Sequence, residues 1–354
     1  MKRENVENEK NVKFEIRSGA DLINQYKKLP EPKLLWNGII EGAFGLITGV
    51  GKTGKTTFAE NLAMSLAVGK NEFYGYELDA NPRKVLFINL EEKLWRIGRR
   101  NSTQIESLNE KEKALFSSNY FVAPEEFPEY LMNDSDWENL EEYIKKINPD
   151  VLFIDSLTHM CMGEIEKSSV AQEFTRKLKK YIAYLNITTF IIHHNTKGND
   201  KPMTQDSIAG SRIITQEFDF ALGLGNVPTA KGGTYSCILY NKDSGKENNK
   251  AITYSFDENY NVLRLGESNV YDLYAETKTD GRKNDKNKNI VVDYILGKHS
   301  QGSQSITSNE LKSEFVENNT FSKQTLYSVI KCLKEDGSII MDNETKGNYF
   351  INID

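Results

Sequence analysis

The sequence predicts an α/β protein whose mostly parallel sheet carries helices on both faces, followed by a small C-terminal module. Three observations predict this fold class. Short apolar runs of strand length alternate with longer segments whose apolar residues recur at helical spacing. A glycine-rich loop connects the first strong apolar run to one of these helical segments. A stretch without hydrophobic residues, 277–289, then sets residues 290–354 apart as a module of small-domain size.

Composition limits the classes of protein to consider. A chain of 354 residues exceeds one ordinary core, which indicates one large domain and a smaller one. The net charge of −6 gives no basic excess, so the bulk composition does not demand a nucleic-acid partner. Three scattered cysteines without a C-x-x-C pair argue against a disulfide framework or a zinc site, and they suggest a reducing cytoplasm. Because no apolar run approaches 18 residues, we expect neither a membrane span nor a signal peptide.

The glycine-rich loop fits the pattern G-x-x-x-x-G-K-[ST], with an apolar strand (44–48) before it and a helical run (57–68) after it. Glycines let backbone N–H groups turn inward around an anion, and the helix N-terminus adds donors and partial positive charge. Lys55 would reach the β- and γ-phosphates of ATP, and Thr56 would place its hydroxyl on Mg²⁺. The alternative is a chance match in a glycine-rich turn. The expected nucleotide-binding residues are Gly49, Val50, Gly51, Lys52, Thr53, Gly54, Lys55, Thr56 and Thr57.

The other core elements follow in order along the chain. Residues 1–13 are polar and predicted to be disordered, and a short helix within 14–28 ends at the Leu29–Pro32 breaker. After the loop and its helix, strands are expected at 84–90, 120–122, 151–156, 187–192, 218–224, 235–241 and 251–256. Helices are expected around 94–97, from a capping box at Ser135–Glu138 through Ile147, and from Val170 to Leu185.

Acidic residues follow two of the apolar strands. Asp155 comes after Val-Leu-Phe-Ile, the Walker B pattern, and would hold the water shell of Mg²⁺ opposite Thr56. Glu91 follows the second strand and would polarise the water that attacks the γ-phosphate, a role in which its neighbour Glu92 could substitute. The alternatives are a turn aspartate at 155 and two glutamates that simply begin a helix, where acids suit the helix dipole.

Two adjacent histidines, His193 and His194, end the fourth strand beside the expected nucleotide. Either would sense the γ-phosphate through a hydrogen bond, although a lone histidine is more often structural. A metal role would need further ligands that the sequence does not provide. Lys197 lies just beyond and is a candidate contact for phosphate or DNA.

These motifs together resemble the RecA-fold ATPases, and most closely the RepA-like branch of hexameric plasmid replicative helicases and their relatives among mobile elements. The resemblance covers roughly residues 35 to 265. The resemblance rests on residues 42–75, 85–92, 151–155 and 191–194, and on Ala209-Gly210-Ser211 with Asp219.

The resemblance implies specific roles and a ring. It assigns phosphate and Mg²⁺ contacts to Lys55 and Thr56, the catalytic glutamate to Glu91, the Walker B aspartate to Asp155, and the γ-phosphate sensor to His193 or His194. It also implies a homo-oligomer, most often a hexamer, with ATP at subunit boundaries and a basic finger from the neighbour. The relatives often carry Lys-x-Arg-x-Gly near a late strand, whereas residues 241–246 here contain no arginine. The substitutes are Lys242, Lys246 and Arg212.

The C-terminal module resembles a winged helix. Helices are expected at 289–298, from a capping box at Ser308 onward, and at 322–335, followed by a hairpin of 339–341 and 349–351. On duplex DNA, the third helix and the wing would present Lys323, Gln324, Thr325, Ser328, Lys331 and Lys346. However, residues 290–354 hold six lysines, no arginine and nine acids, so protein docking is the alternative.

The predicted organisation is therefore an N-terminal tail with a short helix (1–33), a RecA-like ATPase domain (34–276), a linker (277–289) and a winged-helix-like domain (290–354). The expected function is a cytoplasmic, oligomeric ATPase that acts on DNA, as a helicase or translocase of a plasmid, phage or mobile element. Single-stranded DNA would pass through the ring and duplex DNA would meet the winged helix. The alternative is an ATP-switched DNA-binding regulator or initiator with weak ATPase activity and no motor activity.

Overall fold

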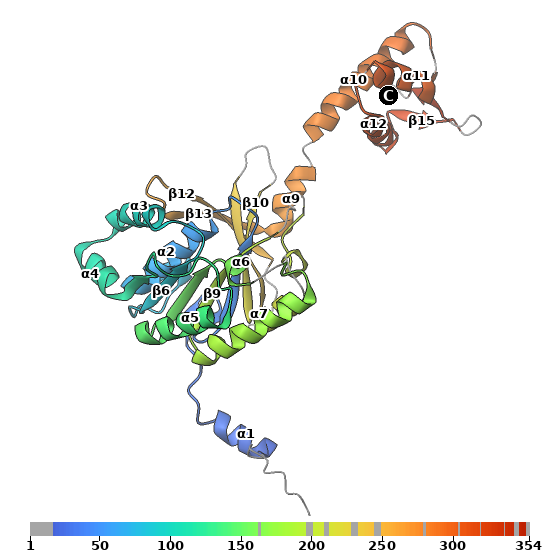
Figure 1. Cartoon of the computed structure of the whole chain (residues 1–354). Coiled ribbons are helices and arrows are strands. Elements are labelled where there is room, and N and C mark those ends of the chain that lie inside the picture. Colours follow the sequence, from blue (N-terminus) through green and yellow to red (C-terminus); the bar gives the residue numbers. More distant parts are fainter. Residues whose placement is uncertain are drawn as a thin grey trace, which may run out of the picture.

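The predicted α/β class is confirmed by a nine-stranded sheet with helices on both faces (Figure 1). In this computed structural model the described residues are 17–351, apart from 162–163, 196–200, 209–211, 228–232, 244–248, 279–280, 304, 319, 336 and 343–346. The predicted disorder of residues 1–13 and the Ala209–Ser211 motif fall outside them. No helix in the described ranges is long and apolar enough to cross a membrane.

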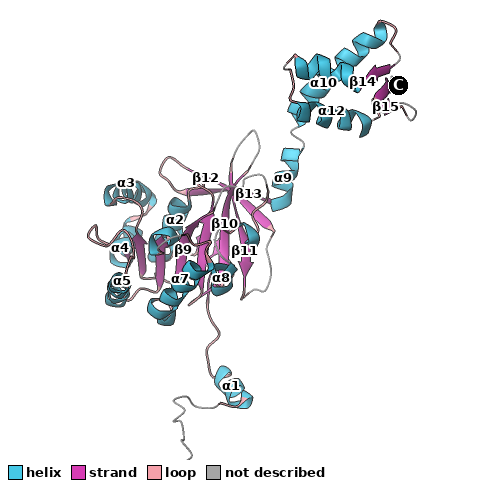
Figure 2. Ribbon diagram, turned by 45° about the vertical axis from the view of Figure 1, so that its right-hand side comes forward, coloured by secondary structure: helices cyan, strands magenta, loops and turns pink. Residues whose placement is uncertain are grey.

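Six neighbouring strands of the sheet run parallel and three run antiparallel at one edge (Figure 2). The parallel strands, in sheet order, are β10 (Phe220–Asn226), β3 (Phe44–Gly49), β9 (Thr188–His194), β8 (Val151–Asp155), β6 (Val85–Asn89) and β7 (Tyr120–Val122). The antiparallel strands are β11 (Thr234–Asn241), β12 (Lys250–Phe256) and β13 (Val262–Asn269). Two small hairpins complete the strands: β1 (Leu34–Trp36) with β2 (Ile39–Ile40), and β4 (Glu72–Phe73) with β5 (Tyr76–Glu77).

One face of the sheet packs on the helix that follows the glycine-rich loop, α2 (Lys55–Val68). Phe58 and Leu62 of α2 are fully buried against Phe87 and Phe153 of the central strands. The β4–β5 hairpin packs on the same core, where the Phe73 ring contacts both Trp36 and Phe58. Two further helices, α3 (Leu94–Gln104) and α4 (Glu110–Asn119), belong to the chain segment that connects β6 to β7.

The other face packs on α5 (Asp134–Ile147) and α7 (Ser168–Tyr181). Trp137 of α5 and Phe174 of α7 meet there at a ring-centroid distance of 6.2 Å, and both side chains are buried. The short helix α6 (Leu157–Met160) and the first residues of α9 (Val270–Lys278) belong to this layer, and α8 (Arg212–Glu217) packs beside α7. The burial of both sheet faces explains why the parallel strands read as continuous apolar runs.

Most predicted strands and helices are present, but several details differ. The capping box of α5 is formed by Asn133 and Asp136 rather than by Ser135, because the Asn133 side chain accepts the N–H of Asp136. β4 was not among the predicted strands. Neither α4 nor β13 was predicted. β13 is an edge strand with a mostly exposed alternation of residues, so it lacks the apolar run of a buried strand.

The segment 277–289, expected as an irregular linker, is largely helical. It is covered by the end of α9 and the start of α10 (Gly281–Ser300). Lysine and arginine have good helix propensity, so a lack of apolar residues does not exclude a helix. The boundary between an ATPase domain and a C-terminal domain within this segment remains a proposal.

The C-terminal region has a hydrophobic core of its own. It contains α10, β14 (Ser305–Thr307), α11 (Ser308–Lys312), a π-helical turn (Ser313–Glu317), α12 (Lys323–Glu335), β15 (Ile339–Met341) and β16 (Asn348–Ile351). The strands form one antiparallel sheet in the order β14-β16-β15. Val291 of α10, Leu326 of α12 and Ile339 of β15 are buried together. The capping box of α11 uses Thr307 and Glu310, not Ser308 as expected.

The predicted N-terminal helix is present as α1 (Gly19–Tyr26), with a capping box of Ser18 and Asp21. None of its residues is buried. Leu22, Ile23 and Tyr26 of the helix, and Leu29 after it, are between 55% and 69% exposed.

Candidate active site

The predicted site residues gather at the edge of the sheet where the parallel strands end. β3 ends at Gly49, β6 at Asn89, β8 at Asp155 and β9 at His194. In the sheet register Gly49 lies beside His194, and Asn89 lies beside Asp155. Loops at the carboxyl ends of parallel strands are where open α/β sheets bind their ligands, so the register brings together motifs that are far apart in the sequence.

The glycine-rich loop turns tightly between β3 and α2, as its sequence predicts. A Cβ on Gly49 would lie 2.1 Å from the Leu224 carbonyl oxygen of the neighbouring strand, so only glycine fits there. Gly54 has φ +76° and caps α2, and this left-handed backbone favours glycine. The Lys55 ammonium curls over the loop and donates to the Val50 carbonyl at 2.9 Å. Burial lowers the pKa of Lys55, and the nearby acids Asp155 and Glu91 oppose this shift.

The loop is held from the antiparallel part of the sheet, by residues that the sequence analysis did not single out. The Tyr254 hydroxyl donates to the Thr53 carbonyl at 2.6 Å, and Tyr254 is 1% exposed. The Phe256 ring lies against Gly54, where an added Cβ would come within 2.4 Å of it. Only the pairing of β11 and β12 places these rings beside the loop, and no sequence motif indicates that pairing.

Thr56 and Asp155 meet as predicted. The Thr56 hydroxyl donates to Asp155 Oδ2 at 2.6 Å. Asp155 is 1% exposed, and its other oxygen, Oδ1, is buried without a hydrogen-bond partner among the described residues. Burial raises the pKa of Asp155 to about 7, with the Glu91 charge adding to the shift, while the Thr56 hydrogen bond opposes it. A buried carboxylate with one oxygen left over suits the shell of a divalent cation, whose charge would favour the ionised form.

Glu91 stands next to this pair and contacts a histidine. Its Oε2 lies 3.1 Å from His194 Nε2, and this hydrogen bond lowers the pKa of Glu91. One ligand atom from each of Glu91, Asp155 and His194 lies within 4.8 Å of the other two. The Asn89 side-chain oxygen accepts the backbone N–H groups of Glu91 and Glu92 at 2.9 and 2.7 Å, which fixes the loop that carries them. The sequence analysis did not anticipate the contact between Glu91 and His194, because it depends on the sheet register.

The two histidines occupy different environments. Successive residues of a strand point to opposite faces, so His193 is turned into the protein and is 2% exposed, whereas the His194 side chain is 40% exposed. His194 is therefore the histidine that can meet a ligand beside Glu91. Glu92 does not join the cluster, because its carboxylate pairs with Arg100 at 2.6 Å.

Among the candidate fingers, only Lys242 has a described side chain. It follows β11 at the amino edge of the parallel strands, opposite the loop, and its ammonium donates to the Gln216 carbonyl at 2.6 Å. Lys242 therefore does not approach the glycine-rich loop of its own chain. Arg212 begins α8, but its side chain lies outside the described part, as do Lys197 and Lys246.

The candidate DNA contacts lie on α12 and beyond it. Lys323 and Lys331 are exposed on this helix, whereas Thr325 is half-buried. The Thr325 backbone N–H donates to the Ser322 hydroxyl at 3.1 Å, so Ser322 caps the helix start. The Gln324 side chain and Lys346 fall outside the described residues.

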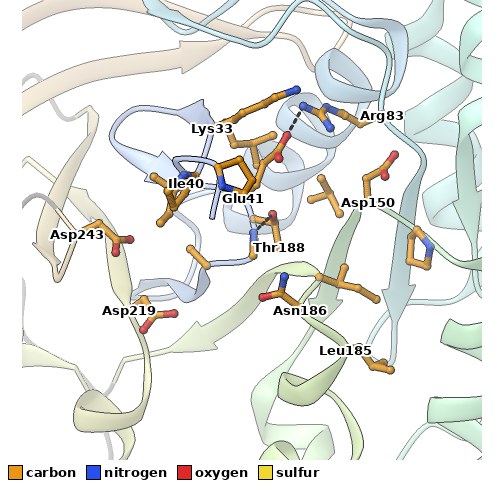
Figure 3. A pocket seen from close by; sticks show the side chains of 18 of the residues that line it. Lys33, Ile40, Glu41, Arg83, Asp150, Leu185, Asn186, Thr188, Asp219 and Asp243 are labelled. Atoms are coloured by element: carbon orange, nitrogen blue, oxygen red, sulfur yellow. Dashed lines mark hydrogen bonds and ion pairs between the residues drawn. The ribbon is translucent and has the colours of Figure 1, made fainter. Parts of the chain in front are cut away.

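A cavity of about 720 Å³ opens at the opposite, amino edge of the sheet (Figure 3). Ala43, Asp150 and Thr188 line it, and each stands at or just before the start of a parallel strand. Two of its acids already bind backbone: Asp219 accepts the Phe44 N–H at 2.9 Å, and Asp150 accepts the Lys84 N–H at 2.8 Å. The glycine-rich loop is at the other edge, so this cavity is separate from the predicted chemistry.

We expect Tyr254→Phe to weaken nucleotide binding about fivefold. A neutral hydrogen bond contributes about 1 kcal/mol, which corresponds to that factor, and the Thr53 carbonyl would lose its donor. Titration of the purified variant with ATP measures the affinity. Tyr271→Phe, on the exposed face of α9, is the control and should match the parent. Equal affinities for parent and Tyr254→Phe would contradict this account of the loop.

The chain is similar to one protein family and to several curated proteins. A family model described as an AAA domain matches residues 13–200. DNA repair protein RadA of Chlamydia trachomatis is 29% identical over 194 residues, which cover 54% of this chain and 35% of that protein. DNA repair protein RadA of Campylobacter jejuni is 27% identical over 193 residues, which cover 53% of this chain and 35% of that protein. The chain thus spans about a third of the length of the curated relatives that it matches.

Among solved structures, a KaiC-like protein from the archaeon Pyrococcus horikoshii aligns with a TM-score of 0.45 and 17% sequence identity. The alignment covers 64% of this chain and 91% of the archaeal chain.

Proposed function

Because the chain belongs to the AAA domain family, with a RecA-like P-loop core, we propose that it binds ATP with Mg²⁺ and hydrolyses it at the carboxyl edge of its sheet. The observation that carries the proposal is the meeting of four predicted groups. The Thr56 hydroxyl is 2.6 Å from Asp155, and ligand atoms of Glu91, Asp155 and His194 lie within 4.8 Å of one another. These groups have the chemistry that phosphoryl transfer to water requires.

Each of these side chains has a separate task in the proposed reaction. The backbone of the loop and the Lys55 ammonium hold the phosphates. Thr56 and Asp155 hold Mg²⁺ and its water shell, and the bound Mg²⁺ supplies charge neutralisation to the phosphate oxygens. Glu91 orients the attacking water and accepts its proton, which suits a carboxylate kept ionised by its histidine partner. His194 contacts the γ-phosphate through the ring that also meets Glu91.

We further propose that the ATPase is a homo-oligomer, most simply a hexameric ring of the RepA-like kind. Helix α1 supports this proposal. A helix of eight residues is not stable in water without packing, and the apolar side chains of α1 are exposed, so a neighbouring subunit would supply the surface that covers them. A basic finger would then come from a neighbouring subunit, with Lys242, Lys246 and Arg212 as candidates. The position of Lys242 at the edge opposite its own loop is compatible with such a trans role.

DNA is the proposed partner. The curated relatives are DNA repair proteins by name. The C-terminal region places α11, α12 and the β15–β16 hairpin in the order of a winged helix, with Lys323 and Lys331 exposed on α12. In this proposal single-stranded DNA stimulates turnover as the chain acts as a helicase or translocase of a plasmid, phage or mobile element.

A second function, an ATP-switched DNA-binding regulator without motor activity, is favoured by one observation. The stretch 241–246 has no arginine, so the strongest kind of finger is missing there. ATP turnover with and without single-stranded DNA, on protein whose mass in solution is measured with ATP present, separates the two. Stimulated turnover in a ring-sized species supports the motor. Slow turnover that single strands leave unchanged, in a monomer or dimer, supports the switch.

A further inference from the structure

The loop between β6 and α3 carries Glu91 and is attached to the glycine-rich loop's own helix through one arginine. Arg100, on α3, donates from Nη2 to Glu92 Oε2 at 2.6 Å. The same guanidinium donates to both carboxylate oxygens of Glu60 on α2, at 2.5 and 2.7 Å. Glu60 lies little more than one helical turn after Lys55 and Thr56, so Arg100 contacts α2 near its phosphate-binding end.

Burial makes this arrangement costly and specific. The Glu60 side chain is 0% exposed, and the Arg100 side chain is 13% exposed. A buried carboxylate needs a hydrogen-bonded counter-charge, and a buried ion pair seldom stabilises a fold more than apolar packing would. Its advantage is geometric, because the planar guanidinium donates its hydrogen bonds to carboxylates only in fixed directions. One fork with two carboxylates therefore fixes α2, α3 and the intervening loop relative to one another.

We propose that Arg100 is a positioning residue for the hydrolysis described above. Glu92 is then the residue through which Arg100 holds the loop that carries Glu91, and it is not a substitute base. The loop is then fixed from two sides. Asn89 holds the backbone N–H groups of Glu91 and Glu92, and Arg100 holds the Glu92 carboxylate. Glu91 is left free to turn toward Asp155 and His194.

The proposal assigns different consequences to two adjacent glutamates. Removing Glu91 removes the group that handles the proton, whereas removing the Glu92 carboxylate only loosens the backbone beneath it. A misplacement of a reacting group by about 1 Å can reduce a rate by roughly 10²-fold, so a looser loop should reduce kcat without weakening the grip on ATP. This inference rests on the proposed ATPase activity, but the movement of the loop can be measured without turnover.

The test compares Glu92→Gln and Arg100→Lys with the parent. Glu92→Gln removes the charge of the link to the loop and leaves at most a weaker, neutral hydrogen bond to Arg100. The buried pair of Glu60 and Arg100 stays in place, so the fold keeps its counter-charge. Arg100→Lys keeps the charge but loses the fork. Glu173→Gln is the control, because it makes the same substitution in an Arg–Glu pair at the exposed surface of α7.

Three quantities are measured: kcat at saturating MgATP, the affinity for a non-hydrolysable ATP analogue, and amide hydrogen exchange of the peptide that spans residues 89–96. We expect both variants to reduce kcat about tenfold, to keep the affinity within about twofold and to speed exchange in this peptide about tenfold. The double variant should lose no more than Arg100→Lys alone, because both changes weaken the same link. The control should match the parent in all three.

Other outcomes overturn the proposal. Unchanged kcat and exchange in Glu92→Gln would show that the ion pair does not position the loop. A loss as complete as that of Glu91→Gln would place Glu92 in the chemistry. Loss of analogue binding would assign Arg100 to the fold of the phosphate site. If the parent shows no turnover, the proposed ATPase function fails. Faster amide exchange of residues 89–96 in the two variants would even then show that Arg100 and Glu92 position the loop, and unchanged exchange would contradict it.

Discussion

Lys55→Ala is expected to abolish ATP turnover, with a loss of about 10³-fold or more. The Lys55 ammonium is the one cation buried within the described part of the glycine-rich loop, where it is 5% exposed and reaches over to the Val50 carbonyl. In a water-excluded site, a preorganised cation stabilises developing phosphate charge far more than it would in water. Alanine removes that charge and leaves the backbone N–H groups alone to hold the phosphates. Phosphate release at saturating MgATP and equilibrium binding of ATP measure the two effects.

Lys70→Ala controls for the loss of a lysine near α2. Lys70 follows the helix at the surface and pairs with Glu112 at 2.7 Å, far along α2 from the loop. This variant should turn over ATP like the parent and melt within a few degrees of it. Undiminished turnover in Lys55→Ala, with Lys70→Ala also active, would exclude this loop as the site of hydrolysis.

Glu91→Gln is expected to reduce kcat by about 10²- to 10⁴-fold while ATP still binds. General acid–base groups contribute rate factors of that size. Glutamine keeps the size of the side chain and retains a hydrogen bond to His194, so the loop should keep its shape. It cannot accept a proton from water at neutral pH. Single-turnover phosphate release measures the chemical step, and titration with a non-hydrolysable analogue shows that binding persists.

Glu173→Gln, measured in the same way, is the control, because it also replaces a carboxylate by an amide but lies at the exposed surface of α7. Its rate of phosphate release should match that of the parent. A fall of less than about tenfold in Glu91→Gln would be too small for a general base. It would then contradict the assignment of Glu91, and a large loss in Glu92→Gln instead would move the base to the neighbouring residue.

Local sequence was enough to locate most of the candidate site. The pattern from Gly49 to Thr56 requires a strand before it and a helix after it, and β3 and α2 supply them. Asp155 and Glu91 follow apolar runs that are too short for helices, so the end of a parallel strand was the natural place for each. Parallel strands end at one edge, and that rule brings the groups together without knowledge of the strand order.

The rest depended on contacts between distant elements. The meeting of His194 with Glu91 follows from β8 lying between β9 and β6, and the sequence does not encode the strand order in any local pattern. Glu60 looked like an ordinary helix residue, yet it is buried and paired with Arg100, 40 positions later. Tyr254 reaches the loop from 201 positions away. The misplaced caps of α5 and α11 have a smaller cause, because neighbouring Asn, Ser and Thr residues can all cap, and only the backbone decides among them.

The central claim is that this loop, with Thr56, Asp155 and Glu91, performs Mg²⁺-dependent hydrolysis of ATP. Phosphate release by the purified chain, measured at saturating ATP first with Mg²⁺ and then with EDTA, tests it most directly. The account predicts turnover with Mg²⁺ that EDTA reduces to the level of Lys55→Ala. No release under any condition, or release that continues in EDTA, would contradict it.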